Sequence, residues 1–138
     1  MDKRIRWLRI SYWAGAIIDA LATIQMLSPQ IFGLTNQLPN FNPGHDFTYA
    51  MGMGASLMLG WTALLLWADR KPLERKGILI ITVVPVIVGI AIAKVVAVSS
   101  GFTTLGSAIP TWGLQVVLIA LFTLSYRNAG RAETRPVR

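Results

Sequence analysis

The sequence predicts an all-α integral membrane protein, a four-helix bundle of transmembrane helices with both termini in the cytoplasm. Of the 138 residues, 54% are hydrophobic and only 14% are charged, whereas a water-soluble domain has about 25% charged residues. The apolar residues form four long runs, and the basic residues lie almost entirely in alternate connections between them. We expect one transmembrane domain over residues 1–138.

Each apolar run is long enough to cross a membrane. Each has about 20 residues, and a helix of that length, rising about 1.5 Å per residue, spans about 30 Å of hydrocarbon. Helices are expected because backbone groups inside a bilayer must form hydrogen bonds within their own segment. A water-soluble four-helix bundle would need a polar face on each helix, and no run has one. The runs cover residues 7–27, 47–68, 77–98 and 107–126.

The basic residues predict the orientation. Twelve of the thirteen Lys and Arg residues precede or open the first run, fill the link 69–76, or follow the fourth run. The connections 28–46 and 99–106 contain no Lys or Arg. Short loops rich in Lys and Arg stay on the cytoplasmic side. This pattern predicts a multi-pass protein of the cell (plasma or inner) membrane, with cytoplasmic termini and residues 127–138 as a cytoplasmic tail.

The net charge of +7 also indicates which partners the protein has. We expect the basic segments to interact with the lipid bilayer, whose anionic headgroups attract Lys and Arg. These segments are short and lack interleaved aromatic residues, so no nucleic-acid partner is predicted.

The first run also resembles a secretory signal, with a basic start, an apolar stretch and Ala-Leu-Ala at 20–22. However, the apolar run continues past this site to Leu27, and Asp19 lies where the apolar core of a signal would end. We expect the segment to remain as the first span, with cleavage after Ala22 as the alternative.

The connection 28–46 is expected to cap the outer ends of the helices. Its prolines at 29, 39 and 43 rule out a long helix, and its apolar side chains make a fully solvated loop unfavourable. At its end we expect Asp46 to be the N-cap of the second helix, with ligand or proton handling as the alternative. The residues expected near an outer mouth are Gln25, His45, Asp46 and Tyr49.

Small residues recur every four positions in the second run, at Gly52, Ser56 and Gly60. Such a face lets helix backbones approach closely in lipid. The first run has a similar stripe that includes Gly15 and Asp19. We expect these faces to pack within the chain, and a homodimer through the Gly52, Ser56 and Gly60 face is the alternative.

The third run contains two exceptional residues, Pro85 and Lys94. Pro85 is expected to kink the helix and free the carbonyl of Ile81. Lys94 is the only charged residue in the run. A charge near the bilayer centre costs about 2.5–3.5 kcal/mol on insertion scales, so its side chain should face protein or water.

We expect Lys94 to form a buried ion pair with Asp19. Counted from the outer helix ends, Lys94 lies about 6–7 Å deep, and Asp19, Ser56 and Gln115 lie about 13 Å deep. Helical side chains lean towards the N-terminus of their helix, so the Lys94 side chain would tip towards the level of Asp19. The alternative is that Lys94 extends outward to the lipid headgroups.

Three functions are compatible with such a pair. In the first, Asp19, Lys94, Gln115 and Ser56 line a pocket that opens outward and binds a small polar or amphipathic molecule, for carriage or sensing. In the second, the pair fixes helix register in a non-catalytic membrane subunit or scaffold. The third is a small membrane enzyme, which is less favoured because the chain has no Cys, a single His and no paired carboxylates at helical spacing. No catalytic residue, metal or cofactor is predicted.

Overall fold

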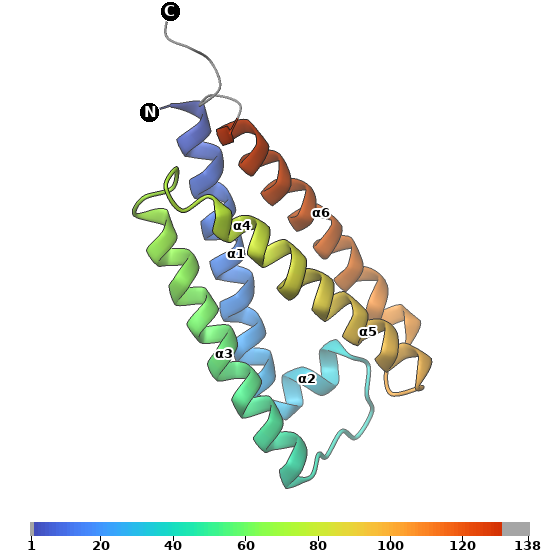
Figure 1. Ribbon diagram of the computed structural model, residues 1–138. Helices are drawn as coiled ribbons and strands as arrows, with labels where there is room; N and C mark the ends of the chain where they lie inside the picture. The colour runs from blue at the N-terminus through green and yellow to red at the C-terminus, as the bar shows by residue number, and fades with distance from the viewer. Residues whose placement is uncertain (1, 131–138) are drawn as a thin grey trace, which may run out of the picture.

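The computed structural model describes residues 2–130, and this part of the chain is helical without strands (Figure 1). It confirms the predicted all-α class, because four helical segments are long and apolar enough to cross a membrane. The third of these is divided into three consecutive elements. The elements are α1 (Lys3–Leu27), α2 (Pro29–Thr35), α3 (His45–Asp69), α4 (Gly77–Ile81), η1 (Thr82–Val88), α5 (Gly89–Ser99) and α6 (Leu105–Gly130).

The bundle has two different ends. The start of α1, the α3–α4 turn and the end of α6 lie together at one end, which we call the basic end (Figure 1). The other end, the α2 end, is formed by α2 and the α5–α6 turn. Helix α1 packs along α3 and also on α6, whereas α5 packs on α6. Figure 1 shows α2 lying between the ends of α3 and α5.

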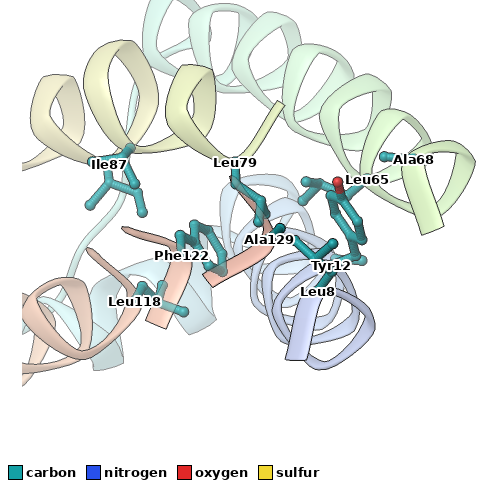
Figure 2. Close-up of a cluster of buried hydrophobic side chains, with 11 residues drawn as sticks. Leu8, Tyr12, Leu65, Ala68, Leu79, Ile87, Leu118, Phe122 and Ala129 are labelled. Carbon is teal, nitrogen blue, oxygen red and sulfur yellow. The ribbon is translucent and has the colours of Figure 1, made fainter. Parts of the chain in front are cut away.

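The apolar core fills the half of the bundle nearer the basic end. Figure 2 shows side chains of α1, α3, α4 and α6 meeting there, including Tyr12, Leu65, Leu79 and Phe122, all fully buried. Lipid chains are as apolar as these side chains, so close van der Waals packing stabilises the contact more than exclusion of water does.

Gly15 permits the closest approach in this core. A Cβ atom placed on Gly15 would lie 3.0 Å from Leu65 Cδ1 and 3.0 Å from Phe122 Cζ. One turn earlier in α1, Ser11 Oγ donates a hydrogen bond to Ser125 Oγ of α6 at 2.8 Å. The small-residue stripe of α1 therefore packs within the chain, as expected.

The small-residue face of α3 does not pack within the chain, so that expectation is wrong. Ser56 is exposed, and a Cβ atom on Gly52 or Gly60 would meet no described atom within 4 Å. Helix α3 instead buries a different face, which includes Ala55 and Leu65. Successive residues of an α-helix are rotated by about 100°, so the neighbours Ala55 and Ser56 lie on different faces. A homodimer through the small-residue face stays a prediction.

A polar cluster joins α1 to α3 at the basic end. Arg9 donates to both carboxylate oxygens of Asp69, from Nε to Oδ1 at 3.0 Å and from Nη2 to Oδ2 at 3.1 Å. Trp13 Nε1 donates to Asp69 Oδ2 at 3.3 Å, and the Tyr12 hydroxyl donates to the Pro72 carbonyl at 3.2 Å. The sequence analysis used Arg9 only as an orientation signal and missed this contact.

Pro85 lies inside η1, a seven-residue π-helical segment. A proline ring clashes with the carbonyl four residues earlier and has no N–H to donate, and a wider π turn accommodates both effects. Thr82, at the start of η1, accepts a hydrogen bond from Trp61 Nε1 of α3 at 3.1 Å. The third span is thus interrupted at the predicted residue, by a widened turn.

The start of α3 differs from the prediction. The N-cap is Gly44, in an extended conformation and without a side-chain cap bond. Asp46 is the second residue of the helix, so the prediction that it is the N-cap is wrong. The helix begins earlier than predicted, and Asp46 in its first turn still places a negative charge at the positive end of the helix dipole.

The packing at Gly15 leads to a prediction on stability. Gly15→Leu is expected to lower the thermal unfolding temperature in detergent clearly, because overpacking a core costs about 1–3 kcal/mol. Gly60→Leu, which adds the same side chain at an exposed position, should unfold close to the wild-type temperature. An equal loss in both variants would contradict the exposed placement of Gly60 and would favour an interface there.

Candidate functional site

A pocket of about 280 Å³ lies at the α2 end of the bundle. Side chains of α1, α2, α3, α5 and the first part of α6 line it. Most of its wall is apolar, including three methionines, Met26, Met51 and Met58. Ligand pockets typically have this composition, a largely apolar wall with a few polar groups.

Lys94 supplies the charge in this wall. Its Nζ donates to Asn36 Oδ1 at 2.6 Å and to Ser107 Oγ at 3.3 Å. Asn36 is the C-cap of α2, Ser107 lies in the first turn of α6, and both are buried. The ammonium group therefore joins α5 to the end of α2 and to the start of α6.

The expected Asp19–Lys94 ion pair is not formed. Lys94 uses two uncharged oxygens instead, and the ion pairs among residues 2–130 do not include Asp19. Helix α1, which carries Asp19, packs on α3 and α6 rather than on α5. The C-cap of α2, Asn36, instead binds the ammonium group of Lys94. The alternative, that Lys94 extends outward to the lipid headgroups, stays a prediction, since its ammonium group binds Asn36 and Ser107 at the α2 end.

Three buried polar atoms in the described part of the chain have no hydrogen-bond partner: Asp19 Oδ2, Thr103 Oγ1 and Gln115 Oε1. Their residues are 9%, 6% and 8% exposed, respectively. Thr103 lines the pocket directly. Asp19 and Gln115 each lie about one helical turn from a lining residue, Ala22 and Thr111 respectively. Buried polar groups are normally hydrogen-bonded. These three atoms therefore indicate a place for a polar partner in the pocket or next to it.

An aromatic cluster lies at the α2 end. Phe41 packs against Phe32 of α2, Phe47 of α3 and Phe102 of the α5–α6 turn, with ring centroids 5.2–6.4 Å apart. Phe32 and Phe102 also line the pocket. Residues 28–46, which the sequence analysis expects to form a cap, are thus attached to α3 and to the α5–α6 turn.

The other predicted site residues are distributed unevenly. Gln25 lines the pocket, and its amide donates to Thr35 Oγ1 at 2.6 Å. Ser56 does not line it, because it lies on the outer face of α3 and donates to the Gly52 carbonyl at 3.0 Å. The three remaining residues expected at the mouth are exposed on the first turns of α3 and do not line this pocket: His45, Asp46 and Tyr49.

Three residues of the site were missed by the sequence analysis: Asn36, Thr103 and Ser107. All three are polar residues in or next to connections that contain other Asn, Ser and Thr residues. Only the fold shows that these three are buried and that Asn36 and Ser107 bind Lys94.

A larger hollow of about 400 Å³ lies at the basic end, beside Arg9 and Asp69. Two of its basic groups already have acidic partners, since Arg9 binds Asp69 and Lys71 binds Glu74 at 3.0 Å. Its charges are largely satisfied within the chain, in contrast to that of Lys94. We therefore take the pocket at the α2 end as the candidate site.

Comparisons of the chain with protein-family models, with curated proteins and with solved structures find no match. The site is therefore interpreted from its own chemistry, which combines an ammonium group, partnerless buried polar atoms and an apolar wall.

The contacts of Lys94 lead to a double-mutant prediction. Lys94→Met and Asn36→Leu should each lower the thermal unfolding temperature, and the double variant should lose less than the sum, because both changes remove the same hydrogen bond. Contacting residues typically show coupling of about 0.5–3 kcal/mol. The control pair, Lys94→Met with Asp19→Asn, should be additive. Strong coupling in the control pair would indicate that Lys94 and Asp19 form an ion pair, and it would contradict this geometry.

Proposed function

We propose that this protein is a multi-pass protein of the cell (plasma or inner) membrane whose pocket opens to the outside and binds a small amphipathic molecule, for carriage or sensing. The observation that carries this proposal is the ammonium group of Lys94 in the wall of an otherwise largely apolar pocket. Ionisable residues at membrane depth are costly to bury and are commonly functional.

The pocket lining supports an amphipathic ligand. Met26, Met51 and Met58 offer flexible, polarizable side chains that adapt to an apolar body of irregular shape. Lys94 and Thr103 add polar groups to this wall. A purely polar molecule would leave the apolar wall without a partner, and a purely apolar molecule would leave the Thr103 hydroxyl unsatisfied.

The position of the charges supports an outward opening. The described basic residues other than Lys94 lie in the first turns of α1, in the α3–α4 turn and near the end of α6, all at the basic end (Figure 1). By the distribution rule for short loops, this end faces the cytoplasm. The pocket and the aromatic cluster then face the opposite side of the membrane.

The orientation can be tested by single-cysteine labelling, because the chain has no native cysteine. Cysteines at Asn42 and Ser100, both exposed at the α2 end, should react with a membrane-impermeant maleimide added to intact cells. Cysteines at Arg6 and Glu74, exposed at the basic end, should react only after the membrane is permeabilised. The reverse pattern would overturn the proposed orientation.

Ligand binding can be tested by filling the pocket. Ala97→Leu adds a bulky side chain to the lining and should abolish saturable binding of short amphiphiles to protein in lipid nanodiscs, as measured by equilibrium dialysis. The matched control, Ala120→Leu, adds the same side chain to the exposed surface of α6 and should bind as the wild type does. If the wild type shows no saturable binding, the scaffold function becomes the better account.

A further inference from the structure

We propose that the ligand of this pocket is an amphiphile with an anionic headgroup, a carboxylate or a phosphate, bound by the ammonium group of Lys94 and the hydroxyl group of Thr103. This inference rests on the proposed function and names the chemical class of its ligand.

The first argument is charge. Lys94 is the only charged residue that lines the pocket in the described part of the chain, and its two hydrogen-bond partners, Asn36 and Ser107, are uncharged. A charge held in an apolar, water-poor environment is costly unless it is paired. Residues 2–130 place no carboxylate in the lining of this pocket, so an anionic ligand would complete the pair.

The second argument is the count of free donors. A lysine ammonium has three N–H donors, and Lys94 uses two of them on Asn36 and Ser107. The hydroxyl groups of Ser107 and Thr111 already donate to backbone carbonyls, those of Thr104 and Ser107 respectively.

Among the donors at the pocket, the third N–H of Lys94 has no partner in the described chain, and neither has the buried hydroxyl of Thr103, a residue that is 6% exposed. A carboxylate has two acceptor oxygens, and a phosphate has more, so either headgroup offers an acceptor for each of these donors. A cationic headgroup would satisfy neither.

The third argument is the depth at which the anion binds. The carboxylate of Asp19 lies about one turn beyond the lining residue Ala22, further from the α2 end, and would repel an anion placed there. Lys94 and Thr103 instead hold the headgroup near the α2 end. Ile90, one turn from Lys94 towards the basic end, and Met58 then line the space for the apolar body.

The size of the pocket limits this body. A volume of about 280 Å³ is at or below the small end of the range for ligand pockets, which is about 300–1,000 Å³. A short alkyl chain or a single ring fits this space, so short-chain acids are suitable probes.

The test compares three probes that share one alkyl chain and differ in headgroup charge: octanoate, octanamide and octylamine. Binding of each radiolabelled probe to the wild type in phosphatidylcholine nanodiscs is measured by equilibrium dialysis, with protein-free nanodiscs subtracted. Octanoate is expected to bind saturably and at least tenfold more tightly than octanamide, and octylamine should bind most weakly.

Variants then assign this preference to residues. Lys94→Gln should reduce octanoate binding to the level of octanamide, Lys94→Arg should retain most of the preference, and Thr103→Val should weaken octanoate binding several-fold. Lys71→Gln, which removes a positive charge at the basic end, is the matched control and should leave binding unchanged. Because the headgroup preference is measured on the wild type, the proposal stays falsifiable even if Lys94→Gln fails to fold.

The outcomes separate the inference from the proposed function. Equal saturable binding of octanoate and octanamide, abolished in Ala97→Leu, would overturn the anionic headgroup and leave the binding pocket intact. Preference for octylamine would also overturn the inference. Absence of saturable binding for all three probes would overturn both proposals.

A final arm identifies the source of the anion. If octanoate binds in phosphatidylcholine nanodiscs and is displaced in phosphatidylglycerol nanodiscs, the site takes a lipid phosphate headgroup from the bilayer. If octanoate binds equally in both, the site takes a free acid. Both results support an anionic headgroup.

Discussion

The absence of water inside the bilayer is the constraint on which the rest of this structure depends. Backbone groups in the hydrocarbon must be satisfied within their own segment, so the apolar runs form helices, and η1 keeps Pro85 within a helical span. Side-chain polar groups face the same requirement, but only the fold provides their partners. Arg9 meets Asp69 and Ser11 meets Ser125 by contacts between helices that are distant in sequence.

The two halves of the bundle meet this constraint in different ways. The half near the basic end is filled by close packing around Gly15, where Leu65 and Phe122 leave no room for a side chain. The half near the α2 end contains the pocket, Lys94 and the three partnerless polar atoms. The proposed binding function depends on this second half of the bundle, where a charged group and partnerless polar atoms lie in or near an apolar wall.

The short helix α2 contacts α5 and α3 in the half of the bundle that contains the pocket. Its C-cap, Asn36, accepts a hydrogen bond from Lys94, and Phe32 packs with Phe41 and Phe47. These contacts place the connection between α1 and α3 over the pocket and make it part of the wall. A ligand that binds the ammonium group of Lys94 would contact the same group that binds the C-cap of α2. Under the proposed function, this contact would link occupancy of the pocket to the position of α2, and such a link is suited to carriage or sensing.

The sequence alone determined the number, type and approximate bounds of the spans, because the length of an apolar run sets whether a helix crosses a membrane. It also indicated Lys94, Gln25, Asp19 and Gln115 as polar residues at membrane depth. Only the tertiary structure decided their partners. Lys94 binds Asn36, 58 positions away in the sequence, because the fold brings the end of α2 to α5.

Ser56 shows the same limit. Successive residues of α3 are rotated by about 100°, so Ser56 lies on a different face from the residues that pack on the neighbouring helices. Because lipid is as apolar as the core, hydropathy cannot distinguish these two faces. Span length is a property of one segment and can be determined from its residues. Helix rotation and the position of a connection depend on close packing between segments, and that packing exists only once the chain has folded.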